Sequence, residues 1–257
     1  MARYGWAPYV SAGQRRAQAL LEMDKLRKEG KTIRPVEPFK RREIARTFWG
    51  QGWCEHLETF SDYENRLPRG RTYVRNGSVC HLDIGRGRVD AIVSGSDLYE
   101  VTISIKTIPK GKWDYIRTSC TGRIGSLLEL LQGRFSDEAM KVVTDRHDGL
   151  FPLPGEMTFD CTCPDWAVMC KHVAAVLYGV GARLDDSPEL IFKLRGVDHE
   201  ELIGGEAIAA ATAAGRRGGG RRKLKGDVAS VFGVEVDESD FDKPPTKQDK
   251  RTGRRSR

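Results

Sequence analysis

Apolar and polar residues alternate through the middle of the chain, a pattern that predicts β-strands. Asn76-Gly77 separates two such stretches, and Asn-Gly favours the positive φ values of a tight hairpin turn. Cys80, Leu82 and Ile84 then occupy alternate positions, so they are expected on one face of a strand. Two further glycine-containing turns follow, and the predicted strands are 72–75, 78–84, 89–93 and 99–105. Together they predict an antiparallel β-meander.

Helical spacing of apolar residues occurs on both sides of this predicted sheet. Ser11 is a favourable N-cap for a first helix, and Gly30 a favourable stop signal after it. Trp49, Trp53 and Phe60 recur at helical intervals; we expect them in the core, with a partner-binding face as the alternative. The predicted helices are 11–28, 48–60, 123–132, 137–145, 170–177 and 187–196. The predicted fold class is therefore α+β.

The charge changes sign along the chain, which has 257 residues and a formal net charge of +7. Residues 1–46 carry 12 Lys/Arg and 5 Asp/Glu, residues 47–203 carry 18 and 23, and residues 204–257 carry 13 and 8. Two basic arms therefore flank a mildly acidic middle. Basic arms attract polyanions such as nucleic acid, but they do not say what the folded part recognises.

The chain contains no apolar run long enough to span a membrane, and its first residues lack the apolar stretch of a secretory signal. It has six cysteines, and without an export signal these argue against a disulfide framework. We therefore expect an intracellular, cytoplasmic protein with reduced thiols. Clustered cysteines in such a compartment are typical of zinc binding.

Four residues with metal-ligand side chains lie close together in the sequence. Cys161 and Cys163 form a C-x-C pair, six residues follow, and Cys170 and His172 form C-x-H. Zinc prefers four tetrahedral ligands drawn from thiolate and imidazole. The first pair is expected at the end of a strand and the second in the first turn of a helix, whose amide groups favour thiolate. The motif predicts one zinc ion bound by these four side chains.

A zinc site closed by four protein ligands has no open position for water or substrate, so we expect a structural ion. Trp166 lies between the two ligand pairs and is expected to shield the loop side of the site. Cys54, Cys80 and Cys120 match no zinc spacing and are expected to be buried free thiols. No carboxylate pair favours acid/base chemistry, and no small-molecule site is evident, so the protein is not expected to be an enzyme.

The ligand spacing resembles that of the SWIM zinc finger. The flanking residues, CPDW at 163–166 and MCKHVAAVLY at 169–178, are similar to bacterial SWIM-finger proteins that accompany SWI/SNF-family helicases. The resemblance extends to FWG at 48–50, YENRLPRGR at 63–71 and residues 127–133, so it covers roughly 46–204 and leaves both basic arms outside. It implies a zinc-stabilised β-hairpin and helix that bind DNA or protein, with a SWI/SNF-type helicase as partner and no catalytic residues.

These patterns divide the chain into four predicted segments. They are a basic N-terminal arm with a helix (1–46), an α+β domain with the meander (47–150), a SWIM-type zinc finger with short helices (151–204) and a disordered basic tail (205–257). Inside the tail, residues 228–234 form an apolar island that is either a docking segment or an idle cluster.

Arginines interleaved with a tyrosine precede Asn76, and further basic clusters occur in the tail. Arginine forks suit phosphate oxygens, and a tyrosine ring can stack on a base. The alternatives are a solvated basic loop and a solubilising tail. The predicted nucleic-acid-binding residues are Arg66, Arg69, Arg71, Tyr73, Arg75, Arg221, Arg222 and Lys223.

Two functions remain open from the sequence. In the first, the zinc-bound chain binds DNA or another nucleic acid and acts as an accessory to a helicase-type complex. In the second, it is a protein–protein scaffold without direct nucleic-acid contact, which the acidic middle of the chain favours.

Overall fold

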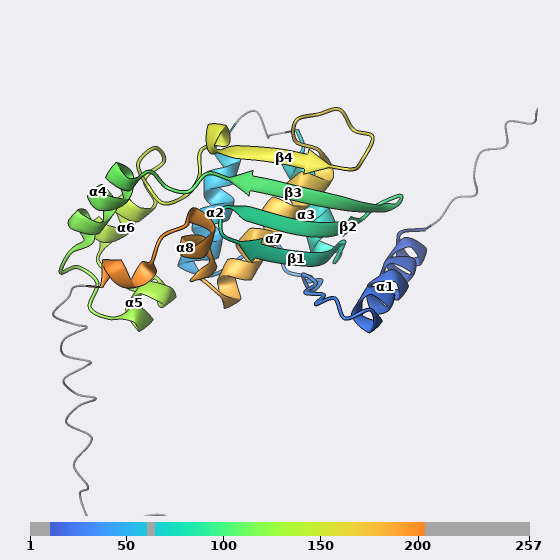
Figure 1. The fold of residues 1–257 in the computed structure, drawn as a ribbon, viewed down its shortest axis with the longest axis horizontal. Coiled ribbons are helices and arrows are strands. Elements are labelled where there is room, and N and C mark those ends of the chain that lie inside the picture. The colour runs from blue at the N-terminus through green and yellow to red at the C-terminus, as the bar shows by residue number, and fades with distance from the viewer. Residues whose placement is uncertain (1–10, 61–64, 204–257) are drawn as a thin grey trace, which may run out of the picture. The chain divides into compact units, whose positions relative to one another are not determined.

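One antiparallel sheet organises the part of the chain that the computed structural model describes, residues 11–60 and 65–203. Its strands are β1 (Val79–Gly85), β2 (Arg88–Ser94), β3 (Leu98–Ile105) and β4 (Met157–Cys161), hydrogen-bonded in that order. Between β3 and β4 the chain forms α4 (Lys110–Cys120), α5 (Leu127–Gln132) and α6 (Asp137–Val143), which lie beyond one end of the sheet (Figure 1). The predicted α+β class and the antiparallel meander are confirmed.

The helix α7 (Lys171–Asp186) lies at the centre of the core. Eleven of its residues are buried, and it contacts all four strands. Two helices, α2 (Phe48–Glu58) and α3 (Leu67–Arg75), pack against α7, so these three helices cover one face of the sheet (Figure 1). Residues on both sides of the division predicted at 150/151 share this sheet and this core.

Small residues allow α2 and α3 to approach α7 closely. A β-carbon added to Gly70 of α3 would lie 2.5 Å from the Cβ of Ala174 in α7. A β-carbon added to Gly181 of α7 would lie 2.5 Å from the Sγ of Cys54 in α2. Both distances are well below van der Waals contact, so a larger residue at either position must separate the helices.

The aromatic face predicted for residues 48–60 belongs to the core. Trp49 and Trp53 are fully buried in α2, and Phe60 is buried just after it. The indole N–H of Trp53 donates to the backbone carbonyl of Leu177 in α7 at 2.8 Å. This face is therefore used inside the protein, as expected.

The helix α1 (Ala12–Lys28) packs on the opposite face of the sheet. Ser11 caps it, because the backbone N–H of Gln14 donates to the Ser11 hydroxyl at 3.2 Å. Ala19 and Met23 are buried against Cys80 in a small second apolar cluster. Cys80 therefore does not share a face with Leu82 and Ile84 as predicted, because the register shifts by a β-bulge between residues 79 and 81.

A buried ion pair lies at the end of the helix α8 (Leu190–Arg195). The side chain of Arg195 is fully buried and donates to Glu156 at 3.0 Å and to the backbone carbonyl of Lys106 at 2.7 Å. Glu156 ends the 3₁₀ turn Pro154–Glu156 that leads into β4, and a second 3₁₀ turn spans His199–Leu202. Lys106 directly follows β3 and Glu156 directly precedes β4, so Arg195 connects α8 to the end of β3 and to the start of β4.

The predicted hairpin around Asn76-Gly77 is wrong. Residues 72–75 are the last turn of α3, Asn76 is its C-cap, and Gly77 adopts a positive φ of 68° directly after it. Pro68 suits the first turn of a helix, and Leu67, Gly70 and Val74 are buried at helical spacing. A glycine at positive φ serves a helix end as well as a hairpin, so the dipeptide alone did not decide between them.

Candidate metal centre

The end of β4 and the start of α7 position the four predicted ligands. Cys161 is the last residue of β4, and the backbone N–H of Thr162 still donates to the carbonyl of Glu100 on β3 at 3.1 Å. Cys170 is the N-cap residue of α7, and His172 lies in its first turn. The predicted placement, one pair at a strand end and one at a helix start, is confirmed.

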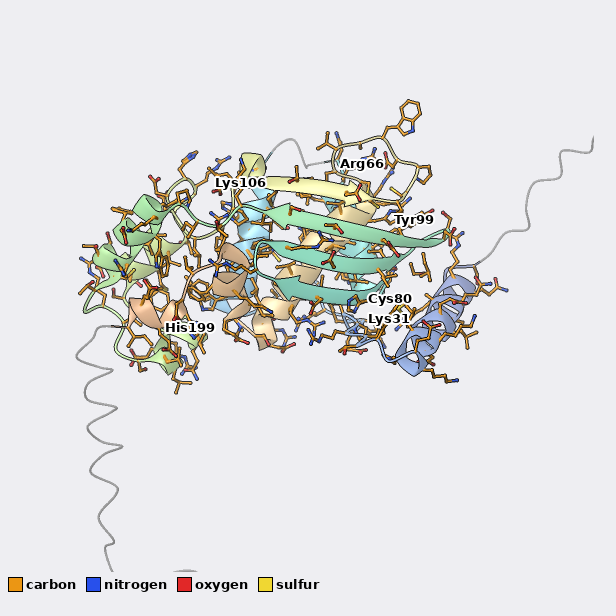
Figure 2. The ribbon with its side chains drawn as sticks, in the orientation of Figure 1. Lys31, Arg66, Cys80, Tyr99, Lys106 and His199 are labelled. Atoms are coloured by element: carbon orange, nitrogen blue, oxygen red, sulfur yellow. The ribbon has the colours of Figure 1, made fainter. Side chains whose placement is uncertain are left out.

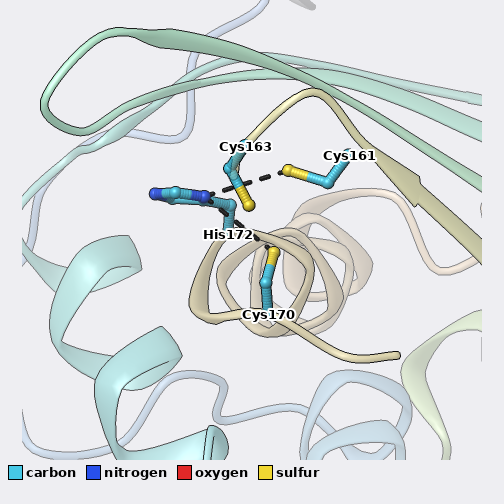
Figure 3. Close-up of side chains that lie close together, drawn as sticks. All are labelled: Cys161, Cys163, Cys170 and His172. Atoms are coloured by element: carbon cyan, nitrogen blue, oxygen red, sulfur yellow. Dashed lines mark hydrogen bonds between the residues drawn. The ribbon is translucent and has the colours of Figure 1, made fainter. Parts of the chain in front are cut away.

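The structure brings the side chains of Cys161, Cys163, Cys170 and His172 together (Figure 3). Their ligand atoms all lie within 4.8 Å of one another. The Nδ1 of His172 is 3.8 Å from the Sγ of Cys161 and 3.9 Å from the Sγ of Cys170. A tetrahedral zinc ion with ordinary bond lengths needs edges of about 3.6 Å between sulfur and nitrogen and about 3.8 Å between sulfurs. The four residues fit one structural zinc ion.

The sulfur atoms already interact with one another and with the start of α7. The thiol of Cys161 hydrogen-bonds to Cys170, and this contact lowers the pKa of Cys170 to about 3; burial opposes the effect, and His172 and the N–H of Val173 assist it. The same contact with Cys170, together with burial, raises the pKa of Cys161. The N–H of Val173 donates to the Sγ of Cys170 at 3.4 Å. A helix N-terminus that donates to sulfur favours thiolate, the form in which cysteine binds zinc.

Two tyrosines fix the imidazole ring of His172. The ring of Tyr99 stacks on it with centroids 4.3 Å apart, and Tyr73 contacts it edge-on at 5.5 Å. Its Nδ1 faces the sulfurs, whereas its Nε2 is buried and has no hydrogen-bond partner in the described part of the chain. A β-carbon added to Gly95 would lie 2.9 Å from that Nε2. The orientation of the ligand therefore depends on packing by residues that the sequence motif did not indicate.

The loop between the ligand pairs is open to solvent. Trp166 is 98% exposed and Val168 is 84% exposed, so the prediction that Trp166 shields the site is wrong. The loop is tied to the start of α3 through Arg66, whose guanidinium lies 3.2 Å from the carboxylate of Asp165. Figure 2 shows Arg66 beside this loop. An ion pair, rather than an aromatic cover, connects the loop to the rest of the fold.

Residues 148–180 match the family model of the SWIM zinc finger. This segment is a SWIM zinc finger. A longer part of the chain is similar to a Mycobacterium tuberculosis protein described as "Uncharacterized protein Rv2102", with 34% identity over 174 residues. That match covers 66% of this chain and 62% of the relative, so it spans less than two thirds of the relative's length. No solved structure gives a significant match to this chain.

Two of the arginines predicted to bind nucleic acid have acidic partners. Arg66 pairs with Asp165, as described above. Arg71 pairs with Glu58 of α2 and also donates to the hydroxyl of Tyr178 at 3.2 Å. Tyr178 in turn donates to Glu58 at 2.8 Å, so this network joins α2, α3 and α7. Arg66 and Arg71 therefore both form contacts within the fold, with a carboxylate as one partner in each case.

The other predicted contacts differ in their surroundings. Arg69 is exposed on α3, whereas Tyr73 is half-buried against His172. Arg75 is half-buried and donates to the backbone carbonyl of Lys40 at 3.3 Å. Arg221, Arg222, Lys223 and the apolar island at 228–234 lie outside the described residues, as does the predicted disorder of the tail.

The remaining cysteines are buried, as predicted. Cys54 and Cys120 lie in the main core, and Cys80 lies under α1. Burial raises the pKa of Cys54 to about 12, which disfavours its thiolate and thus metal binding. Across residues 11–60 and 65–203, none of the helices is long and apolar enough to span a bilayer.

Proposed function

We propose that this chain is a zinc-stabilised nucleic-acid-binding module that acts in the bacterial cytoplasm as an accessory to a helicase-type complex, and that it is not an enzyme. The observation that carries the proposal is that most basic residues of the described N-terminal arm form no ion pair. Seven of them form no ion pair with any acidic residue in the described structure; they are Arg15, Arg16, Lys28, Lys31, Lys40, Arg42 and Arg46. Cationic side chains that form no ion pair are available to phosphate groups.

The zinc site supports binding rather than catalysis. Three thiolates and one imidazole complete a tetrahedral zinc ion and leave no coordination position for a substrate. The ion connects the end of β4 to the start of α7, the most buried helix of the described fold. Its role in the proposal is to hold this part of the protein in one shape.

The helicase partner is proposed from the resemblance to SWIM-finger proteins that accompany SWI/SNF-family helicases. The SWIM segment supports it, since such fingers often take part in protein or nucleic-acid interactions. The partner is expected to supply the motor activity, and this chain the additional contact with nucleic acid.

A second candidate function is a protein–protein scaffold. Trp166 and Val168 favour it, because both are almost fully exposed on the zinc loop. Tryptophan is frequent among the residues that contribute most to protein interfaces. The acidic middle of the chain favours it as well, since residues 47–203 carry 18 Lys/Arg and 23 Asp/Glu.

The test is the salt dependence of DNA and RNA binding by the zinc-loaded full chain, measured by fluorescence anisotropy. If about five phosphates are contacted, affinity for a single strand falls about 100-fold between about 50 and about 200 mM salt. A zinc-loaded protein that shows no salt-sensitive binding to either nucleic acid contradicts the proposal. Trp166→Ala separates the two functions, because it is expected to reduce co-purification of a protein partner in the scaffold and to leave nucleic-acid affinity unchanged.

A further inference from the structure

A groove with a volume of about 890 Å³ opens beside the zinc finger. It lies between the first turns of α1, residues 38–40, the end of α3 and the turn between β2 and β3. Four cationic side chains line it, and no acidic side chain among the described residues does. We call it the basic groove, and its cations are Arg15, Arg16, Lys40 and Arg75.

The cations of the basic groove are not neutralised within the described structure. None of the four forms an ion pair there, in contrast to Arg66, which precedes α3, and to Arg71, which lies on α3 with Arg75. The Nε of Arg75 is buried and lacks a hydrogen-bond partner in the described chain, although its terminal nitrogen donates to the carbonyl of Lys40. Neutral hydrogen-bonding side chains also line the groove; they are Thr72, Asn76, Ser78 and Ser94.

Two aromatic residues line the groove between these cations. Phe39 and Tyr73 are both half-buried. A cation lies over one face of each ring: the guanidinium of Arg41 is 4.9 Å from the ring centroid of Phe39, and the Nζ of Lys171 is 5.8 Å from that of Tyr73. Tyr73 also contacts the ligand His172 at 5.5 Å, and Gly95 of the groove lies against the same imidazole. One wall of the basic groove is therefore built directly on the metal site.

Figure 2 places Tyr99, which stacks on His172, at the end of the sheet where Cys80 lies. The residues around Cys80 pair with the same part of β2 as Tyr99, because Val93 lies between Val79 and Tyr99 in the sheet. The metal site, the β2–β3 turn and α1 thus meet at one end of the sheet, and the basic groove lies there.

We propose that the basic groove binds a single strand of nucleic acid, with the four cations on phosphates and the aromatic rings beside bases. This inference rests on the proposed nucleic-acid function and assigns it a site. Non-specific single-strand sites combine a positively charged groove with aromatic side chains. The volume exceeds what one phosphate ion fills, and cations that form no ion pair attract a strand of regularly spaced negative charges.

The test uses the zinc-loaded full chain and a labelled single-stranded oligonucleotide of about 12 residues, long enough for a site of this class. The variant is Arg16→Glu/Lys40→Glu, in which both side chains are exposed in the free protein. We expect its affinity to fall at least tenfold and its salt slope to shrink by about 1.4, since each single-strand phosphate contact contributes about 0.7. Lys106→Glu is the control, because Lys106 is exposed, does not line the groove and lies at the other end of the sheet from Cys80 and Tyr99 (Figure 2); its affinity is expected to fall less than threefold.

The outcomes separate this inference from the proposed function. If the wild type binds with salt sensitivity and the double variant binds equally well, the groove is not the site and the proposed function stands. If the wild type binds neither DNA nor RNA, both are wrong. A duplex or a poly-glutamate peptide that binds more tightly than the single strand overturns the assignment of the ligand.

A second measurement avoids any substitution. Acetylation of the unaltered protein, read by mass spectrometry, compares Lys40 with Lys106 in the presence and absence of the oligonucleotide. We expect the oligonucleotide to slow modification of Lys40 severalfold and to leave modification of Lys106 unchanged. Equal protection of both lysines, or of neither, contradicts binding in the basic groove.

Discussion

Replacing Gly95 with alanine tests how the turn between β2 and β3 holds the metal site. The added β-carbon would lie 2.8 Å from the Cε2 of Tyr99 and 2.9 Å from the Nε2 of His172. Gly95 is not one of the glycines with positive φ, so its backbone accepts alanine without strain. The cost must therefore come from the two rings, which are both buried and stacked at 4.3 Å.

The size of the effect follows from these distances. An ordinary carbon contact is about 3.5–4.0 Å, so the rings must move by about 0.6 Å or more. Metal-ligand distances tolerate only about 0.2 Å, so such a movement displaces the Nδ1 of His172 from its position in the tetrahedron. We expect zinc affinity to fall about 10- to 100-fold, as for other perturbed supporting residues. At saturating zinc this equals roughly 1.4–2.7 kcal/mol of lost stability.

Competition with a chromophoric zinc chelator measures this change in affinity, and thermal unfolding with and without added zinc measures the change in stability. Gly155→Ala is the matched control, since a β-carbon there meets no atom within 4 Å. It is expected to leave zinc affinity unchanged. If Gly95→Ala binds zinc as tightly as the wild type, the described packing of His172 against this turn is wrong.

Other predictions concern the helices, the exposed loop and acid stability. Gly70→Ala forces α3 away from the backbone of α7 and should cost roughly 2–3 kcal/mol in denaturant unfolding, despite the better helix propensity of alanine; an unchanged midpoint would refute that close contact. Trp166→Ala should change stability by less than about 0.5 kcal/mol, whereas Trp53→Ala should cost about 3–5 kcal/mol, because the first is 98% exposed and the second fully buried; equal effects would contradict these environments. Burial alone would raise the pKa of Glu156. The backbone N–H of Leu153, directly before the 3₁₀ turn, and the guanidinium of Arg195 hold this pKa below its usual value of 4.5. Its stabilising effect is therefore present above that value and is lost as the pH falls through the lower pKa of the folded state. Glu156→Gln should cost roughly 3 kcal/mol at neutral pH, and the difference from the wild type should shrink below about pH 4 in unfolding experiments; a difference independent of pH would count against the ion pair.

Features that depend on local sequence were predictable. The four metal ligands lie within one strand end, one loop and one helix start, so their spacing alone indicated the site. The capping of α1 by Ser11 and the end of α8 at Gly196, with φ of 73°, are likewise local signals. In each case the residues that determine the structure are neighbours in the sequence.

Features that depend on distant contacts were not predictable in the same way. The segment before Asn76-Gly77 could be a hairpin strand or the end of a helix, and packing of Gly70 against α7 favours the helix. The exposure of Trp166 depends on the path of the zinc loop, which an ion pair with α3 holds. Tyr99 carries no motif and reaches His172 only because β3 pairs with β4.

A helix could have been found with closer attention to spacing, whereas the basic groove could not. Trp113, Ile116 and Cys120 of α4 are buried at helical intervals, although no helix was predicted there. The basic groove has a weaker signal, because Arg16 and Lys40 are separated in the sequence from Arg75. Only the fold brings these charges to one end of the sheet.

The central claim is that three sulfurs and one imidazole hold a single zinc ion, and the ratio of zinc to protein tests it most directly. The ratio is measured by elemental analysis of reduced wild-type protein and of Cys163→Ser, both purified without chelators. We expect one zinc ion per wild-type chain and a large loss of zinc in the variant, since the four ligand atoms are arranged for one tetrahedral ion. Reduced wild-type protein without zinc, or a variant that keeps its full complement, would contradict the account.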